Sequence, residues 1–450
     1  MKAKTEDIAL PQGFVKSLAP LLKEEMQDFL QSYEKPFHRG LRENLGKVPQ
    51  GGLHSWVEGL LGKVPWEKDG MYITLDSAAG AHPLHEAGAY YLQEPSAMAA
   101  VGALDPKPGE WVLDLCAAPG GKSTQIAARM GGQGLLISNE PVASRAQVLS
   151  GNLERMGVKN ALVTCETPER LNHKWPGCFD RVLVDAPCSG EGMFRRHPET
   201  RAEWTEQAPL GCARRQMEIL LHGAGMVRAG GILCYSTCTF NTIENEGVVE
   251  NFLKEHTEFS LAPFALSPDV RTESGMLHLF PHRVAGEGHF VALMRKCGEA
   301  ENRAVRTNAL PAPDKGSMDA YHAFCRDVFG GPGPDIAGLF AGRLVSAPVL
   351  PDISGLKVLR AGLHLGQARG KHFVPDHAWA MGMARPYPCP AFSMTKEEGM
   401  AYLRGETLPA PPEMKGWMLP VFAGLALGWG KVSDGMMKNH YPKGLRRLNA

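Results

Sequence analysis

Short apolar segments that alternate with helical patterns constrain the fold of this chain more than any other feature. Five of these segments predict strands, over residues 111–116, 134–139, 161–165, 181–185 and 231–236. Helices are predicted over 122–130, 143–156, 210–227 and 244–252, and a closing strand over 289–295. This alternation is typical of a doubly wound, mainly parallel α/β sheet with helices on both faces.

Polar turns follow three of the predicted strands. The first holds Cys116 and Lys122, the second holds Asp185 and Cys188, and the third holds Cys238. Ligands of open α/β sheets bind outside the carboxyl ends of the strands, so we expect the three turns to meet in one crevice. Two thiols, a carboxylate and a glycine-rich turn in one crevice indicate covalent chemistry on a bound group.

The first turn is predicted to hold a cofactor. It consists of small residues before a lysine, namely Cys116, Ala117, Ala118, Pro119, Gly120, Gly121 and Lys122. Small residues let the backbone approach a ligand, and the amides at a helix start favour an anionic or polar partner. Glu140, about twenty residues beyond the glycines, is placed to accept hydrogen bonds from ribose hydroxyls. We therefore expect an adenosine compound, which leaves nicotinamide dinucleotide, ATP and S-adenosylmethionine open.

A P-loop that hydrolyses nucleotides is an alternative interpretation of this turn. Residues 116–123 match the pattern G-x-x-x-x-G-K-[ST] except that Cys116 replaces the first glycine. The replacement removes backbone freedom that the phosphate cradle uses. A P-loop also gives Glu140 no role, so nucleotide hydrolysis is the less favoured hypothesis.

The two thiols suit methylation of a cytosine at carbon-5, which is a poor nucleophile in the neutral ring. Thiolate attack at carbon-6 makes carbon-5 nucleophilic, a carboxyl group can stabilise the adduct, and a second thiol can assist its release. Cys238, Cys188 and Asp185 are the residue types that this reaction needs. The residues alone leave open which thiol attacks, because a nearby lysine or helix start lowers the pKa of a thiol.

Composition and charge limit the possible partners. The 450 residues predict roughly two to four domains, and 48 basic residues balance 48 acidic ones. Local basic patches must therefore bind any nucleic acid. Candidates are a weak patch at 35–42 and the tail, with Lys431, Lys438, Lys443, Arg446 and Arg447.

No apolar run approaches the ~20 residues of a membrane helix, and no signal peptide is evident. We expect a cytoplasmic protein with no membrane segment, metal or obligatory protein partner.

Changes in composition divide the chain into five parts. We predict an amino-terminal α/β domain at 1–94, the central sheet at 95–297, a linker at 298–316, an intermediate domain at 317–385 and a β-rich module at 386–450. Apolar residues recur at helical spacing over 14–34 and predict one amphipathic helix there.

Three segments of the chain resemble the motifs of one known family. They are Leu-Asp-Leu-Cys-Ala-Ala-Pro-Gly-Gly-Lys-Ser at 113–123, Asp-Ala-Pro-Cys-Ser-Gly-Glu-Gly-Met at 185–193 and Ser-Thr-Cys-Thr-Phe at 236–240. Segments 88–96, 139–140 and 438–446 extend the likeness. On these residues the chain resembles the Nol/Nop/Sun family of RNA cytosine-5 methyltransferases, specifically the bacterial branch that acts on 16S ribosomal RNA.

The resemblance implies a fold and roles for individual residues. It implies a Rossmann-like class I methyltransferase sheet between an amino-terminal RNA-binding domain and a carboxy-terminal PUA-like module. Cys238 would be the nucleophile, and Cys188 would assist release of the product. Residues 116–122, Glu140 and Asp185 would bind S-adenosylmethionine, with Asp185 also near the target base and Lys122 near the catalytic loop. The adenine contact stays open between Glu166 and Thr167.

The substrate implied by the resemblance is ribosomal RNA or the small ribosomal subunit. Chemistry at a ring carbon requires the base to leave its stack, and we expect Arg195, Arg196 and His197 to hold the flanking phosphates. A non-catalytic RNA-binding assembly factor on the same scaffold is a further alternative. The presence of Cys238, Cys188, Asp185 and Glu140 disfavours it.

Overall fold

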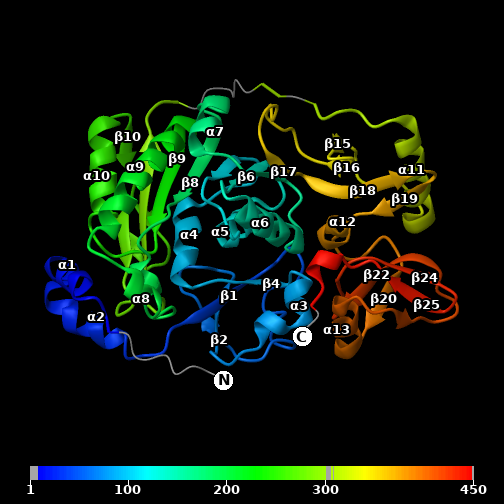
Figure 1. The fold of residues 1–450 in the computed structure, drawn as a ribbon, viewed down its shortest axis with the longest axis horizontal. Helices are drawn as coiled ribbons and strands as arrows, with labels where there is room; N and C mark the ends of the chain where they lie inside the picture. The colour runs from blue at the N-terminus through cyan, green and yellow to red at the C-terminus, as the bar shows by residue number, and fades with distance from the viewer. Residues whose placement is uncertain (1–8, 300–305, 308, 448–450) are drawn as a thin grey trace.

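Within the described residues, a nine-stranded sheet forms the centre of the molecule (Figure 1). The computed structural model describes residues 9–299, 306–307 and 309–447, so 1–8, 448–450 and positions 300–305 and 308 of the predicted linker lie outside it. The strands in spatial order are β10 (Phe259–Leu261), β14 (His289–Lys296), β9 (Val227–Thr237), β8 (Phe179–Asp185), β5 (Trp111–Asp114), β6 (Leu135–Asn139), β7 (Ala161–Thr164) and β17 (Val358–Ala361), with β13 (Met276–Leu279) beside β14. The predicted α/β class is confirmed.

The five strands predicted from the apolar segments pair in parallel, in the order β9, β8, β5, β6 and β7. β14 runs antiparallel between β9 and β10, and β17 runs antiparallel beside β7. The carboxyl ends of the parallel strands therefore share one edge of the sheet, which we call the carboxyl edge. The opposite edge, where these strands begin, is the amino edge.

Helices cover both faces of the sheet, as Figure 1 shows. One face packs against α4 (Ala99–Leu104), α5 (Gly121–Met130) and α6 (Ala143–Arg155), and the other against α7 (Pro168–Lys174), α9 (Ala208–Met226) and α10 (Glu246–Glu255). Along β8, Val182 and Val184 join the second core while Leu183 joins the first. Successive strand side chains point to opposite faces, so a strand covered on both faces is apolar throughout.

The amino-terminal region differs from its prediction in one respect. The single helix predicted over 14–34 is wrong: the segment forms α1 (Gln12–Leu22), a 3-10 turn η1 (Lys23–Glu25) and α2 (Met26–Ser32). Lys23 has φ +47, outside the helical region, and Pro20 lacks the amide hydrogen that a continuing helix uses. A four-stranded sheet follows, with the spatial order β2 (Leu60–Lys63), β3 (Gly70–Ile73), β1 (Arg39–Glu43) and β4 (Tyr90–Leu92). The short helical elements of this region are η2 (Ala79–Ala81), α3 (Pro83–Glu86) and η3 (Ser96–Met98).

The segment predicted as an intermediate domain packs onto the central sheet. Its elements are α11 (Lys315–Phe329), β15 (Gly338–Phe340), β16 (Arg343–Ser346), β17, β18 (Leu363–Arg369), β19 (His372–Pro375) and α12 (His377–Gly382). β17 completes the central sheet beside β7, and its buried Arg360 pairs with Glu154 of α6. This strand ties the segment to the sheet that carries the predicted cofactor turn.

The carboxy-terminal module shares a hydrophobic core with the amino-terminal sheet. Its elements are β20 (Ala391–Met394), α13 (Lys396–Arg404), β21 (Leu408–Pro409), β22 (Gly416–Phe422), β23 (Leu425–Ala426), β24 (Gly430–Ser433), β25 (Met436–Asn439) and η5 (Lys443–Leu445). Leu41 and Tyr90 of the amino-terminal sheet belong to the same core as Tyr402 and Phe422. Glu86 and Arg447 form an ion pair across the same junction. The amino-terminal sheet and the carboxy-terminal module therefore pack together.

Short elements near the carboxyl edge complete the fold. They are η4 (Glu191–Met193) and α8 (Thr200–Glu203); the hairpin of β11 (Phe264–Ala265) and β12 (Arg271–Thr272) lies elsewhere, with Leu266 of its turn beside α4. Among the residues that the structure describes, none of the helices combines the length and apolarity needed to cross a membrane.

Candidate active site

The two cysteine turns leave neighbouring parallel strands and lie side by side. Asp185, at the end of β8, pairs in register with Ser236 near the end of β9. The turns after these strands bring the Sγ atoms of Cys188 and Cys238 to 3.3 Å, although the residues are 50 positions apart in sequence. Both thiols are free and partly exposed. The hydrogen bond with Cys238, together with burial, holds the pKa of Cys188 well above its ordinary value.

Two buried glutamates fix the relative position of these turns. Glu244 accepts hydrogen bonds from the Ser189 amide at 3.0 Å and from Asn241 Nδ2 at 2.8 Å. Glu191 accepts from the Phe240 amide at 2.9 Å and from the Asn241 amide at 3.1 Å. Both carboxylates are 0% exposed, and a hydrogen bond is electrostatically stronger where water is excluded. These bonds hold the Cys188 turn against the Cys238 turn.

The sequence analysis missed both glutamates as site residues. Glu191 lies inside the second motif, and Glu244 follows the third motif by a few residues. A charged residue that lies close to a reactive cysteine and ends up fully buried needs partners. The sequence pattern showed the charge but not the burial.

Asp185 forms the charged centre of the site. Its Oδ2 lies 2.7 Å from Lys122 Nζ, and its Oδ1 accepts a hydrogen bond from Ser236 Oγ at 2.8 Å. Burial alone would raise the pKa of Asp185, but the charge of Lys122 and the adjacent His289 hold it well below its ordinary value. Burial alone would lower the pKa of Lys122, but the Asp185 carboxylate raises it. The pair therefore stays ionised at neutral pH.

The glycine turn lies where β5 ends and α5 begins, in the place predicted for it. Gly120 has φ +114, a conformation that only glycine adopts readily. A Cβ atom at Gly121 would lie 3.3 Å from Cε1 of Tyr91, so a side chain there would crowd the turn. Cys116 is partly exposed, and burial with the nearby Asp114 raises the pKa of its thiol. The two glycines therefore let the turn pack closely against Tyr91 and against Leu149 of α6.

Asp114 precedes the turn and is fully buried. Its Oδ2 accepts a hydrogen bond from Ser123 Oγ at 2.7 Å, while Oδ1 has no hydrogen-bond partner among the described residues. Burial raises the pKa of this carboxyl to about 7. Asp114 thus has unused hydrogen-bonding capacity directly beneath the turn.

Glu140 follows β6, at the same edge as the turn. It is buried, with Oε1 accepting from the Val142 amide at 3.0 Å and Oε2 lying 3.3 Å from Arg145 Nη1. Arg145 Nη2 also donates to the carbonyl of Ala118. The structure therefore brings Glu140 to the glycine turn, as the spacing predicted.

Both candidates for the adenine contact are engaged within the protein. Glu166 Oε1 accepts from the Lys357 amide at 2.6 Å, and its Oε2 lies 3.0 Å from Arg170 Nη1. Thr167 caps α7, with Oγ1 accepting from the Arg170 amide. Glu166 therefore helps to anchor the segment that precedes β17.

The expected phosphate-binding role of Arg195 is wrong. Its side chain is 7% exposed, lies 2.7 Å from Glu287 Oε1 and donates to the carbonyl of Ser32. Arg196 is exposed, and His197 lies 3.1 Å from Glu199. Arg195 therefore links the Cys188 turn to the amino-terminal helices instead of facing a nucleic acid.

The two predicted basic patches are smaller than the sequence indicated. Arg42 is buried and donates to Gln93 Oε1 at 2.6 Å, and Arg447 pairs with Glu86. The exposed lysines of the tail are Lys431, Lys438 and Lys443. Spacing alone cannot separate a cation that bridges two domains from one that faces solvent.

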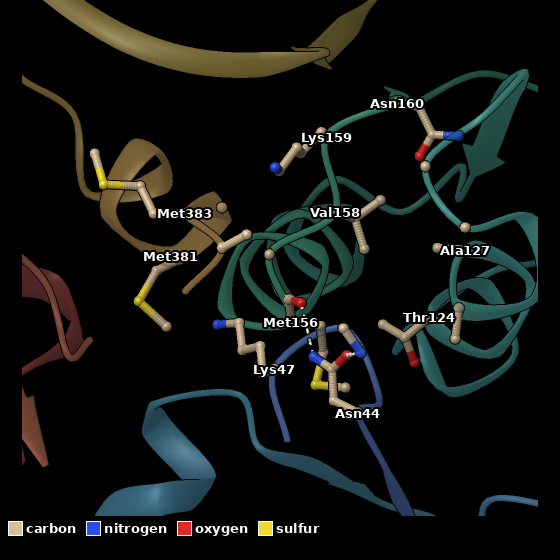
Figure 2. A pocket seen from close by; sticks show the side chains of 17 residues that line it. Asn44, Lys47, Thr124, Ala127, Met156, Val158, Lys159, Asn160, Met381 and Met383 are labelled. Carbon is tan, nitrogen blue, oxygen red and sulfur yellow. Dashed lines mark hydrogen bonds between the residues drawn. The ribbon is translucent and has the colours of Figure 1, made fainter. Parts of the chain in front are cut away.

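A hollow of about 350 Å³ lies at the amino edge, away from the cysteines (Figure 2). Lys47 lines it and donates to the carbonyls of Ala87 and Arg155 at 2.7 and 3.0 Å. Asn44 donates to the carbonyls of Gly88 and Met156. The polar atoms in this hollow therefore join the amino-terminal sheet to the end of α6.

Comparison with known families covers four consecutive stretches of the chain. The matching family descriptions are the N-terminal domain of 16S rRNA methyltransferase RsmF at 10–95, 16S rRNA methyltransferase RsmB/F at 101–295, the RsmF rRNA methyltransferase first C-terminal domain at 323–383 and the methyltransferase RsmF PUA domain at 389–447. The order of the four follows the order of the folded units.

Individual relatives match over nearly their whole length. Ribosomal RNA small subunit methyltransferase F of Erwinia tasmaniensis is 31% identical over 468 residues, covering 98% of this chain and 98% of the relative. The protein of the same name from Klebsiella pneumoniae is 31% identical, with 98% and 97% covered. A solved methyltransferase homolog from Pyrococcus horikoshii has a TM-score of 0.53 and 28% identity, covering 64% of this chain and 100% of that one. The chain belongs to the ribosomal RNA small subunit methyltransferase F family.

Proposed function

We propose that the protein transfers a methyl group from S-adenosylmethionine to carbon-5 of a cytosine in 16S ribosomal RNA, through a covalent bond between Cys238 and the base. The observation that carries this proposal is the pair of thiols, 3.3 Å apart, beside the Asp185–Lys122 ion pair. Redox and hydrolytic sites do not need this combination. Carbon-5 methylation of a pyrimidine needs a nucleophile, a group that assists release and a charged anchor for the base.

The protein's own residues supply each step except the methyl group. The Cys238 thiolate bonds to carbon-6, and the displaced electron pair makes carbon-5 nucleophilic. After carbon-5 has accepted the methyl group, its proton passes to solvent and the C–H electron pair re-forms the double bond between carbon-5 and carbon-6. The carbon-6–sulfur bond breaks in the same step and returns the Cys238 thiolate. Cys188 assists this release from its position beside Cys238. The ionised Asp185 accepts a hydrogen bond from the amino group of the cytosine.

S-adenosylmethionine is the cofactor of this family, and when bound it supplies an electrophilic methyl group. Residues 116–122, Glu140 and Asp185 would hold it. The structure fits this role, because the buried Asp114 keeps an unused oxygen beneath the turn. Asp185 is already paired with Lys122, which disfavours the magnesium-binding role that a P-loop hydrolase would require.

Ribosomal RNA would contact the protein mainly outside the central sheet. We propose that the amino-terminal domain and the carboxy-terminal module, whose sheets share a core, bind RNA as one unit through exposed cations such as Lys431, Lys438 and Lys443. Phosphate contacts release counterions, so we expect affinity to fall steeply as salt rises. An affinity that does not change between low and moderate salt would contradict this part of the proposal.

The experiment that tests the proposal is bisulfite mapping of 16S ribosomal RNA from cells with and without the protein. We expect one or more cytosines to lose protection when the protein is absent, and to regain it when the wild-type chain is restored. A separate binding experiment distinguishes the cofactors: S-adenosylmethionine should raise the melting temperature, and ATP should not. Unchanged protection at every cytosine would overturn the proposal.

A further inference from the structure

His289 is a buried histidine of the site that neither the sequence analysis nor the mechanism uses. It is the first residue of β14, which pairs antiparallel with β9 so that Phe290 faces Thr237. His289 therefore lies beside the end of β9, where Cys238 follows Thr237. The same edge places Asp185 on the other side of β9, since Asp185 pairs with Ser236. His289 therefore lies at the junction of the three strands that build the site.

The imidazole of His289 is enclosed but lacks close partners. It is 2% exposed, and neither ring nitrogen has a hydrogen-bond partner among the described residues. Its Nε2 lies 3.6 Å from Oδ1 of Asp185, slightly too far for a hydrogen bond. Leaving a polar ring buried without a partner is unfavourable, and an apolar side chain would fill the same space without this cost. The arrangement indicates a role beyond packing.

The charged groups around His289 define its protonation state. Lys122, Asp185 and Glu94 act on it electrostatically, and burial with the charge of Lys122 lowers its pKa. The ring is therefore neutral at physiological pH and has one N–H to donate. Asp185 Oδ1 is the anionic oxygen that this N–H can reach.

We propose that His289 is a positioning residue, which orients Asp185 toward the amino group of the target cytosine. This inference rests on the proposed function. A carboxylate accepts about four hydrogen bonds, and Lys122 and Ser236 already take one each on different oxygens of Asp185. A short closure of the 3.6 Å gap lets His289 take a third. The acceptor capacity of Asp185 that remains then has a fixed direction. Toward the base it matches an amino group and repels the oxygen that uracil carries there.

The test compares variants of the full chain in methyl transfer to 16S ribosomal RNA. Replacing His289 by leucine removes the N–H donor, and His289→Gln keeps an amide donor of similar reach. His364→Leu is the matched control, because His364 is also buried with an unpartnered Nε2 but lies on β18, away from the site. The readouts are kcat, the Kd for S-adenosylmethionine, the melting temperature and the rate of adduct formation with RNA containing 5-fluorocytosine.

We expect His289→Leu to lower kcat and the adduct rate about tenfold with an unchanged cofactor Kd, as for loss of one oriented hydrogen bond. His289→Gln should recover most of the activity, and His364→Leu should match the wild type. The inference would be overturned if His289→Leu were as active as the wild type. It would also be overturned if His289→Gln folded but remained as slow as His289→Leu. Absence of methylation and adduct in the wild type would instead overturn the proposed function.

Discussion

The two edges of the central sheet carry similar polar residues but use them differently. At the amino edge, the hollow in Figure 2 is lined by Lys47 and Asn44, whose nitrogens donate to backbone carbonyls. At the carboxyl edge, Cys188 and Cys238 stay partly exposed, and Asp185 is anionic with an oxygen open to further donors. An evident hollow is therefore a poor guide to the site here. Unused chemical capacity is the better guide.

The difference follows from the topology of the sheet. The turns that follow parallel strands lie at one edge of the sheet, and here these turns contain the residues available for chemistry. The ends of α5 and α6 lie at the amino edge. The polar groups there form hydrogen bonds with the amino-terminal sheet region. We expect substitutions at the carboxyl edge to change chemistry, and substitutions at the amino edge to change stability.

The largest expected effect is at Cys238. Replacing Cys238 by alanine removes the proposed nucleophile and should reduce methyl transfer roughly a thousandfold or more, with cofactor binding retained. The matched control is Cys234→Ala on β9, the strand that precedes the turn, because Cys234 is fully buried in the core. That variant should lose stability and keep its kcat. Comparable activity losses in the two variants, measured with tritiated cofactor, would contradict the contrast between turn and strand.

The next effect separates the two thiols of the carboxyl edge. Replacing Cys188 by alanine should leave attack intact and slow release, so a protein–RNA adduct should accumulate. Denaturing gel electrophoresis of the reaction mixture detects it as a shifted band that resists denaturant. A stable adduct with Cys238→Ala and none with Cys188→Ala would reverse our assignment of the two roles.

A smaller effect is expected at the amino edge. Lys47→Met keeps the length of the side chain but removes its two hydrogen bonds to carbonyls. We expect about 1–3 kcal/mol less stability in urea unfolding, because buried carbonyls lose their donors. Burial, together with the charge of Arg155, lowers the pKa of Lys47 to about 7, so the measurement should be made at one fixed pH. A fall in kcat under conditions where the variant is folded would place chemistry at this edge.

The smallest effect concerns the pH dependence of stability. Burial raises the pKa of Asp114 to about 7 in the folded protein, while an unfolded aspartate ionises near its ordinary value of 3.8. The unfolded state therefore loses its proton first as the pH rises, and the folded state loses stability between about pH 4 and pH 7. Asp114→Asn removes this contribution. As the pH rises through that window, the melting temperature of the wild type should fall relative to that of the variant. If the melting temperatures of the two proteins changed in parallel with pH, Asp114 would be ionised in the folded state.

Much of the fold was predictable because the central strands are short, apolar and separated by helical patterns. The five predicted strands all exist, although β8 and β9 begin earlier than predicted, at Phe179 and Val227. The helix over 14–34 failed because apolar spacing is insensitive to one residue with a left-handed backbone, here Lys23. The spacing of Glu140 from the glycines placed it at the turn because helix and strand lengths between them are set locally.

The supporting residues of the site were less predictable. Glu191, Glu244 and His289 act through partners that are distant in sequence, so no local pattern marks them. Arg195 and Arg447 looked like cations available to RNA, yet each pairs with a carboxylate of another element. Whether a charge is buried depends on what packs over it, and local sequence does not contain that information.

The amino-acid sequence by itself determined the class of sheet, the position of the glycine turn and the presence of reactive residues after three strands. Hydrophobic periodicity and turn chemistry are local properties, so they can be read along the chain. Only the tertiary structure decided the strand order that sets two sulfur atoms 3.3 Å apart across 50 residues, and that the amino-terminal sheet and the carboxy-terminal module share a core. Both depend on burial of apolar surface between distant segments, which the chain gains only when all its layers pack together.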